Sequence, residues 1–184
     1  DANGNLTKLT VNGKTQQYVY DAANRLTSVK NGAGTVIASY TYDGDGQRFT
    51  KTVGSETITY HYFKGQLMYE TSNQYADKVT ARYTWTPEGK LLSVYIFRPI
   101  GGYWNYYYYH YNAHGDVVAV TDTNGAVYRQ YAYDPYGNII SVKDGAGASI
   151  DMSADDNFNH AYTYAGYRYD KETGLYFLNA RYYH

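Results

Sequence analysis

The chain has 184 residues, a formal net charge of −1 and no cysteine. Its Lys and Arg residues are scattered, which argues against a nucleic-acid surface, and the lack of cysteine excludes disulfides and thiolate metal sites. No apolar run reaches the length of a membrane-spanning helix. Tyrosine is the unusual residue, with 27 Tyr against 5 Phe and 2 Trp, and together with 18 Gly it favours strands joined by tight turns.

A phrase of Tyr-x-Tyr-Asp, followed three residues later by Gly or Asn, recurs along the chain. In one copy Asn112 replaces the Asp. The spacing from Tyr20 to Tyr42 is 22 residues, as is that from Tyr111 to Tyr133. A fixed period predicts one supersecondary unit stacked on copies of itself. The residues of this signature are Tyr18, Tyr20, Asp21 and Asn24; Tyr40, Tyr42, Asp43 and Gly46; Tyr109, Tyr111 and Gly115; and Tyr131, Tyr133, Asp134 and Gly137.

Each unit reads as strand, turn, strand, turn. The two Tyr rings lie on one face of a strand, because side chains alternate with a period of two. The Asp suits a turn in which its carboxylate accepts the amide two residues on, and the Gly or Asn suits a positive φ. An outgoing strand follows, as at Leu26 to Val29, and a second turn such as Asn12-Gly13 closes the unit. We therefore expect an all-β fold of stacked antiparallel hairpins, without helices.

Three stretches depart from this pattern. After Gly46 the first large apolar residue, Phe49, comes one place later than Leu26 does in its unit, which predicts a bulge or a shifted register. Residues 63–105 are less regular, although residues 84–92 still read as strand, turn and strand. Residues 145–160 are small and polar and predict a loop.

The repeated phrases carry a resemblance to a known family. Residues 20–26 and 42–48 resemble YD repeats, and residues 109–140 resemble the start of the Rhs-associated core. Residues 164–183 are similar to the family's Asp-x-Glu-Thr-Gly-Leu-Tyr-x-x-x-Ala-Arg-Tyr-Tyr signature. The chain is thus identified as a member of the Rhs/YD-repeat family. Its signature residues in this tail are Gly166, Tyr169, Asp170, Gly174, Arg181 and Tyr182.

The resemblance implies a division of the chain into YD repeats (1–62), an irregular β-repeat segment (63–105) and an Rhs-associated core region (106–184), all within one continuous sheet. In the family that sheet spirals and closes into a hollow shell around a toxic C-terminal domain. We therefore expect a non-catalytic structural module from a large bacterial protein that is secreted or held at the cell surface. Its partners would be neighbouring YD repeats and the enclosed toxin domain.

The two ends of the sequence suggest an excerpt from a longer array. Residues 1–6 match the turn half of a unit whose first strand is missing. The family usually continues after Ala-Arg-Tyr-Tyr with Asp or Asn and then Pro, whereas His184 stands here, and a purification tag is one explanation. Cutting a sheet exposes edge strands, so we expect self-association through an edge or exchange of a terminal hairpin.

Candidate chemical sites all have a simpler structural interpretation, and no cofactor or catalytic pair is expected. His110 and His114 have metal-pair spacing on a helix, but here they fall on a strand end and a turn. Residues 43–47 resemble the opening of a calcium loop, but the twelfth position is Gly54 instead of Glu. The acidic residues of the 145–160 loop, and Asp134-Pro135, are assigned to a solvated loop and to a turn. The loop acids are Asp151, Asp155 and Asp156.

A run of aromatic residues supports an alternative function. Trp104 precedes four tyrosines, residues 106–109, and strand alternation places Tyr106 and Tyr108 on one face and Tyr107 and Tyr109 on the other. We expect mainly packing against neighbouring strands, with Arg168 and Arg181 among the Tyr rings. The alternative is a carbohydrate- or cell-surface-binding module that uses exposed Tyr and Trp.

Overall fold

The computed structural model describes residues 1–98, 102–151, 161–178 and 182–183. Thirteen strands form one antiparallel sheet in which each strand pairs with the next along the chain. This sheet, called the wall below, confirms the predicted fold of consecutive hairpins. Its strands are β1 (Lys8–Val11), β2 (Lys14–Tyr20), β3 (Leu26–Asn31), β4 (Val36–Tyr42), β5 (Arg48–Val53), β6 (Glu56–Phe63), β7 (Gln66–Ser72), β8 (Lys78–Trp85), β9 (Leu91–Arg98), β10 (Tyr103–Tyr111), β11 (Val117–Thr121), β12 (Val127–Tyr133) and β13 (Ile139–Lys143).

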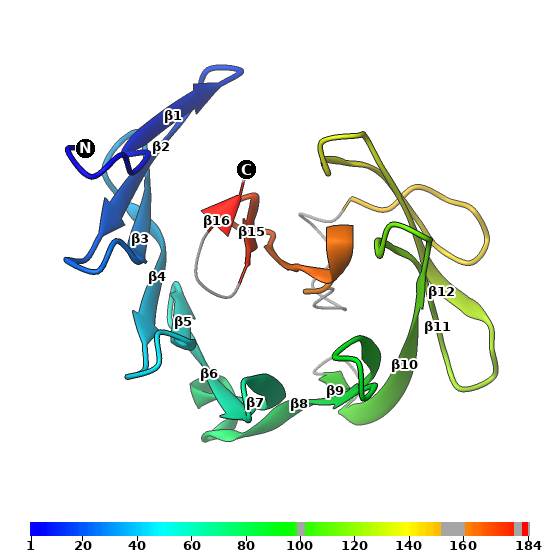
Figure 1. The fold of residues 1–184 in the computed structure, drawn as a ribbon. Coiled ribbons are helices and arrows are strands. Elements are labelled where there is room, and N and C mark those ends of the chain that lie inside the picture. Colours follow the sequence, from blue (N-terminus) through cyan, green and yellow to red (C-terminus); the bar gives the residue numbers. More distant parts are fainter. Residues whose placement is uncertain (99–101, 152–160, 179–181, 184) are drawn as a thin grey trace.

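The wall curves into an open arc, and the C-terminal part of the chain lies inside it (Figure 1). Three short strands there form a second antiparallel sheet: β14 (Arg168–Asp170), β15 (Leu175–Phe177) and β16 (Tyr182–Tyr183). The described residues 161–178 and 182–183 are called the inner segment below. The expectation of one continuous sheet is therefore wrong for this segment, because the chain leaves the wall after the bridge between Lys143 and Ser149. The proposed boundaries near residues 62 and 105 remain a prediction, and the wall runs across both.

Six hairpins of the wall contain the same irregularity in register. In five of them the last residue of the incoming strand pairs with the first residue of the outgoing strand, and the next outgoing residue bulges out. In the hairpin of β6 and β7 the same pair lies one residue further from the turn. This register directs the outgoing residue of each pair to the concave side, where Leu26, Leu67 and Val117 are buried. The six pairs are Tyr20 with Leu26, Tyr42 with Arg48, Tyr62 with Leu67, Trp85 with Leu91, Tyr111 with Val117 and Tyr133 with Ile139.

The unit after Gly46 follows this rule, so its predicted bulge is confirmed but is not peculiar to it. Phe49 occupies the bulge and is 46% exposed, whereas Arg48 takes the inward position and is 0% exposed. The late first apolar residue of this unit is therefore explained by Arg48, which is buried at the position where Leu26 stands in the earlier unit. Residues 63–105 also keep the unit, and residues 84–92 form the predicted strand, turn and strand.

The turns follow the predicted chemistry. Asp21 Oδ1 accepts the backbone N–H of Ala23 at 2.9 Å and also that of Arg25 at 2.9 Å. Asp43, Asn112 and Asp134 accept two amides in the same way. An Asn side chain keeps the accepting oxygen, which explains how it replaces Asp. The predicted positive φ is confirmed at Gly4, Asn24, Gly46, Gly115 and Gly137.

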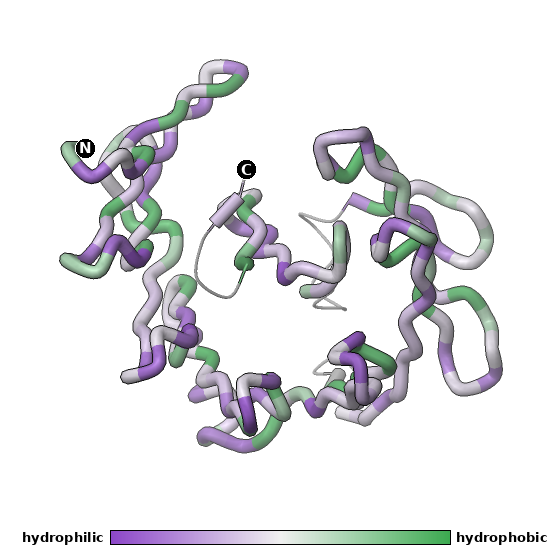
Figure 2. The backbone as a smooth tube through the Cα atoms, viewed as in Figure 1, coloured by the Kyte–Doolittle hydropathy of each residue, from purple (hydrophilic) through white to green (hydrophobic). Residues whose placement is uncertain are grey.

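The core lies on the concave side and is rich in tyrosine. Buried Tyr18 and Tyr40 pack with Leu26, Val29 and Leu175 at one end of the arc, and a second cluster around Tyr83, Tyr109 and Val120 follows at the other. Hydrophobic positions recur at short intervals along the chain instead of in one long stretch (Figure 2).

In the part of the chain that the structure describes, the helical content is limited to two 3₁₀ turns, η1 (Asn73–Tyr75) and η2 (Tyr164–Gly166). Among the described residues, no helix is long and apolar enough to cross a membrane.

Candidate functional site inside the arc

Tyrosine hydroxyls join successive units of the wall along its concave side. The hydroxyl of Tyr42 donates to the carbonyl of Leu26 at 2.6 Å. Leu26 is the inward residue of the preceding unit. The same bond recurs three more times with tyrosine, and Trp85 makes it through its indole N–H. These bonds are Tyr62 to Arg48 (3.0 Å), Trp85 to Leu67 (2.7 Å), Tyr111 to Leu91 (2.7 Å) and Tyr133 to Val117 (2.7 Å). The second Tyr of three signature copies, Tyr42, Tyr111 and Tyr133, thus binds its hairpin to the one before it.

A buried ion cluster connects the wall to the inner segment. Arg48 Nη1 on β5 donates to Asp170 Oδ2 on β14 at 2.5 Å, and both side chains are 0% exposed. Lys51 Nζ on the same strand lies 3.2 Å from Asp170 Oδ1 and 2.8 Å from Glu172 Oε1. Arg48 also lies over the rings of Tyr60 and Phe177 at 4.8 Å and 4.6 Å. Both cations of β5 are therefore directed inward at carboxylates more than one hundred residues away.

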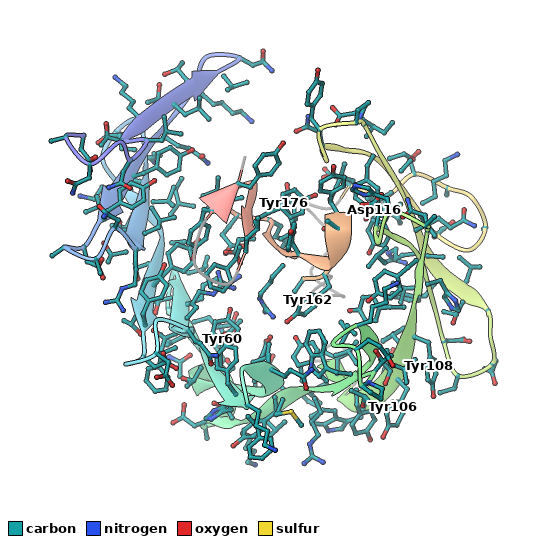
Figure 3. All side chains as sticks on the ribbon, in the orientation of Figure 1. Tyr60, Tyr106, Tyr108, Asp116, Tyr162 and Tyr176 are labelled. Carbon is teal, nitrogen blue, oxygen red and sulfur yellow. The ribbon has the colours of Figure 1, made fainter. Side chains whose placement is uncertain are left out.

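A second ion pair lies beside the first. Arg168 Nη2 on β14 is 2.7 Å from Glu70 Oε1 on β7, and both groups are almost fully buried. The hydroxyl of Tyr83 donates to the same Glu70 oxygen at 2.6 Å. The Tyr60 ring has Arg48 at 4.8 Å and Arg168 at 4.7 Å from its centre, and Tyr60 and Tyr162 are seen inside the arc in Figure 3. The expectation that Arg168 stacks among Tyr rings is confirmed.

The electrostatics of this cluster favour the charged forms. Burial by itself would raise the pKa of Asp170, but the charges of Arg48 and Lys51 outweigh it and lower that pKa to about 2. Burial would likewise lower the pKa of Lys51, yet Asp170 and its neighbours raise it above the ordinary value. Each buried charge is thus compensated by a partner from the opposite sheet, which such a buried charge requires.

The far end of the arc holds the inner segment through backbone groups. Asp116 Oδ1 accepts the N–H of Ala165 at 2.9 Å. The Tyr176 hydroxyl donates to the carbonyl of Gly137 at 2.9 Å, and that of Tyr183 donates to the carbonyl of Tyr136 at 2.9 Å. Burial would raise the pKa of Asp116, but hydrogen bonds from its neighbours lower it. The inner segment consequently bridges strands that are far apart along the arc.

Glycine 137 has a second role at this contact. Its φ is +90°, and a Cβ placed on it would lie 2.5 Å from the ring of Tyr164 in the inner segment. The comparable turn glycine, Gly46, has a φ of +80° and no atom within 4 Å of such a Cβ. Gly137 therefore allows the positive φ of the turn, and its lack of a side chain leaves room for the Tyr164 ring of the inner segment.

The structure places the remaining signature residues as follows. Tyr18, Tyr40, Tyr109 and Tyr131 are buried in the core, and Tyr182 stacks obliquely on Tyr40 at 5.4 Å. Gly166 and Gly174 have positive φ in turns of the inner segment, and Tyr169 packs on Tyr176 at 5.0 Å. Arg181 lies outside the described residues. The signature does not converge on one point but is distributed along the wall and its contacts.

The alternative chemical candidates have ordinary contacts. His110 Nε2 is 2.9 Å from Thr121 Oγ1, and His114 Nδ1 is 2.9 Å from Asp116 Oδ1, so the two rings have different partners. Asp43 is used by its turn, as described above. Of the loop carboxylates, Asp155 and Asp156 lie outside the described residues. Within the part that the structure describes, no three His, Asp or Glu side chains are grouped for a metal.

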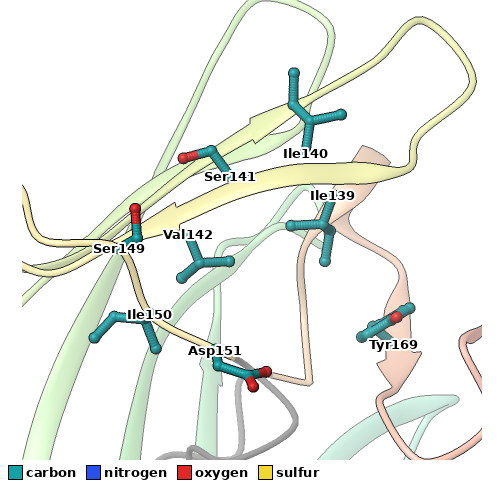
Figure 4. A pocket seen from close by; sticks show the side chains of 8 residues that line it. All are labelled: Ile139, Ile140, Ser141, Val142, Ser149, Ile150, Asp151 and Tyr169. Atoms are coloured by element: carbon teal, nitrogen blue, oxygen red, sulfur yellow. The ribbon is translucent and has the colours of Figure 1, made fainter.

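Asp151 lines a pocket of about 310 Å³ between the last strand of the wall and the inner sheet (Figure 4). Ile139, Val142 and Ile150 line it from the wall side, and Tyr169 lines it from the inner segment. Four of the eight lining residues are aliphatic, and the other four, Ser141, Ser149, Asp151 and Tyr169, carry polar groups. We interpret the pocket as an imperfect fit between the two sheets.

The aromatic run on β10 has the predicted alternation. Tyr107 and Tyr109 are buried, whereas Tyr106 and Tyr108 are 44% and 37% exposed on the outer side of the arc (Figure 3). Sequence reasoning did not identify the inward charges Arg48, Lys51 and Glu70. The one available signal was Arg48 in a position where the neighbouring units carry Leu or Val.

Three comparisons with known proteins agree with this architecture. A family model described as RHS Repeat matches residues 1–36, 20–59 and 111–149. The chain is 41% identical over 186 residues to the tRNA3(Ser)-specific nuclease WapA of Bacillus spizizenii and 40% identical to the tRNA nuclease WapA of Bacillus subtilis (strain 168). These alignments cover the whole chain but only 7% of each relative.

The fold also matches a solved structure. The whole chain superposes on part of the Photorhabdus luminescens Tc holotoxin pore with a TM-score of 0.68 at 18% identity, covering 9% of that chain. At this identity the likeness concerns the fold alone. The repeated hairpins, the matched family model and this shared curved sheet lead to one conclusion: the chain belongs to the RHS repeat family.

Proposed function

We propose that the chain is a non-catalytic wall module whose own inner segment holds the arc in its curved form. The observation that carries this proposal is the buried pairing of Arg48 and Lys51 with Asp170. The ionisable groups of this cluster are largely buried and bound to structural partners. Such an arrangement favours a mechanical role over a catalytic one.

In the full-length protein, we propose, this module forms part of a shell that encloses a C-terminal toxin domain. The module occupies about 7% of the curated relatives it matches, and these are named as tRNA nucleases. Toxic activity would then reside in a separate part of the protein. The bacterial relatives support a secreted or cell-surface location, where a shell would keep the toxin inactive until delivery.

Limited proteolysis of the full-length protein tests the enclosure. We expect the toxin domain to resist a protease that cuts the same domain when it is produced alone. Asp170→Asn should expose the domain, because it loosens the inner segment, whereas Asp45→Asn on an exposed turn should leave it protected. Equal cleavage of the domain in the intact protein and in isolation would refute the enclosure.

The edges of the wall provide the contacts to neighbouring repeats. Strand β1 pairs only with β2, so its other edge is unpaired among the described residues. We propose that a preceding repeat covers this edge in the longer protein and that the isolated chain associates through it. Light scattering should show a mass that rises with concentration, and a constant monomer mass over a wide range would count against this.

Carbohydrate binding remains a second candidate function. The outer face of strands β6–β10 favours it, and the geometry there selects a particular kind of sugar.

A further inference from the structure

A row of large side chains crosses the outer face of the wall. The pairing register places His61 opposite Tyr69, Tyr69 opposite Arg82, Arg82 opposite Tyr95, and Tyr95 opposite Tyr106. The row therefore spans five neighbouring strands, β6 to β10, which is about 19 Å at a strand spacing of about 4.8 Å. Its exposed rings include Tyr69 (38%) and Tyr106 (44%).

The rings form two stacks, one on each side of Arg82. His61 stacks on Tyr69 with centroids 4.3 Å apart and an interplanar angle of 11°. On the other side Tyr95 stacks on Tyr106 at 4.2 Å and 23°, and on Trp104 at 4.8 Å and 27°. These ring faces are occupied, so a sugar cannot lie flat on them. The position between Tyr69 and Tyr95 in the row belongs to β8, which contributes Arg82 there and no aromatic ring.

Arg82 lies between Tyr69 and Tyr95 in the row. Its side chain is exposed, and it has no hydrogen bond, ion pair or ring contact among the described residues. Tyr69 and Tyr95 are two strands apart, or about 10 Å. The part of the row at Tyr69, Arg82 and Tyr95, called the slot below, thus has an aromatic side chain on each side of a cation that is unpaired among the described residues.

The surroundings of the slot are neutral and rich in hydroxyl groups. Thr71 follows Tyr69 on the same face, and Thr80 and Thr84 flank Arg82 in the same way. No acidic residue belongs to the row. A ligand that complements it has one negative charge, a flat body and several hydroxyl groups.

The row lies between the parts of the chain that the family model matches. The family model matches up to residue 59 and again from residue 111, whereas the row covers residues 61–106. In the matched part, the corresponding outward row across β2–β5 consists of Val19, Ser28, Ser39 and Thr52. The backbone unit is the same in both parts, so the wall does not require the aromatic row.

We propose that the slot between Tyr69 and Tyr95 binds an acidic sugar of a polysaccharide, with Arg82 pairing its carboxylate. A guanidinium pairs well with a planar carboxylate, and the ring faces suit the apolar faces of a pyranose. Nucleic acid is disfavoured because it is bound through many cations, and this chain has a net charge of −1. The proposal is independent of the wall function, which would stand if the slot were empty.

Calorimetric titration of the chain with hexagalacturonate tests this site, with neutral maltohexaose as the comparison. We expect hexagalacturonate to bind at least tenfold more tightly. Arg82→Gln and Tyr69→Leu should each weaken it at least tenfold. The matched controls, Lys30→Gln on β3 and Phe49→Leu on β5, remove an equivalent charge and ring elsewhere on the wall and should change binding less than twofold.

Circular dichroism should show that all four variants keep the wild-type fold, since every substitution is at the surface. Absence of binding by the wild-type chain would overturn the proposal. So would unchanged binding by Arg82→Gln, or binding of hexaglutamate as tight as that of hexagalacturonate, which would indicate an acidic peptide site.

Discussion

Two units of the wall use the same backbone position in opposite ways. In the unit from β2 to β3 the first outgoing residue is Leu26, which packs with Tyr18 and Val29. In the unit from β4 to β5 it is Arg48, which pairs with Asp170. The bulge, the turn and the tyrosine before it are the same in both. The unit therefore specifies the shape of the wall, and the inward residue specifies what the wall holds.

This difference explains why the charges occur where they do. A buried ion pair contributes little net stability compared with apolar packing, but breaking it is costly. Leu26 could pack against many apolar surfaces. Arg48 and Lys51, in contrast, need a carboxylate at one particular position. We infer that β5 and β7, through Arg48, Lys51 and Glu70, fix the register at which the inner segment docks.

The largest predicted effect is that of Asp170→Asn. It leaves two buried cations without their carboxylate, so we expect a loss of about 3–5 kcal/mol in the free energy of unfolding. Urea denaturation followed by tryptophan fluorescence measures this. Asp45→Asn, on an exposed turn, should change stability by less than about 0.5 kcal/mol. A loss below about 1 kcal/mol at Asp170 would show that the cluster does not hold the inner segment.

A comparison of turn glycines sharpens the same point at the other end of the arc. Gly46→Ala should cost about 1–2 kcal/mol, because only the positive φ opposes it. Gly137→Ala should cost about 1–3 kcal/mol more, since its Cβ also meets the Tyr164 ring. Thermal unfolding of the two variants measures the difference. Equal losses would mean that the inner segment does not pack on this turn.

The pH dependence of stability should reveal Asp170. Its folded pKa, about 2, is below its ordinary value of 3.8, so its stabilisation is complete above about pH 4. That stabilisation, about 2 kcal/mol, is lost as the pH falls through about 2. Denaturation midpoints between pH 5 and 2 should fall steeply in the wild type and less so in Asp170→Asn. Parallel curves for the two proteins would contradict the assignment.

The smallest effect concerns the hydroxyls that join the units. Tyr42→Phe and Tyr133→Phe each remove a hydrogen bond to a carbonyl and should cost about 1 kcal/mol. Tyr20→Phe is the matched control, because its hydroxyl has no such bond among the described residues. Chemical denaturation distinguishes them, and a similar loss in all three would mean that the bonds do not contribute.

The wall could be predicted from sequence because its determinants are local. Tyr-x-Tyr sets the strand face and Asp21 to Asn24 set the turn, all within a few residues. The unit within residues 63–105 was harder to recognise, because Trp85 replaces the tyrosine and Lys64-Gly65 forms a shorter turn.

The inner segment could not be predicted from those local rules. Arg48 and Asp170 are 122 residues apart, and neither shows in sequence which opposite charge it will meet. The repeat period ends after β13, but it does not predict that the following residues enter the concave side of the wall.

A double-mutant cycle between Arg48 and Asp170 tests most directly whether this pair docks the inner segment. Arg48→Leu introduces the residue that β3 carries, and Asp170→Leu removes the charge opposite. Each single variant should lose about 3–5 kcal/mol, whereas the double variant should lose at least about 2 kcal/mol less than their sum. Additive losses would contradict the central claim that the buried pair holds the inner segment in the arc.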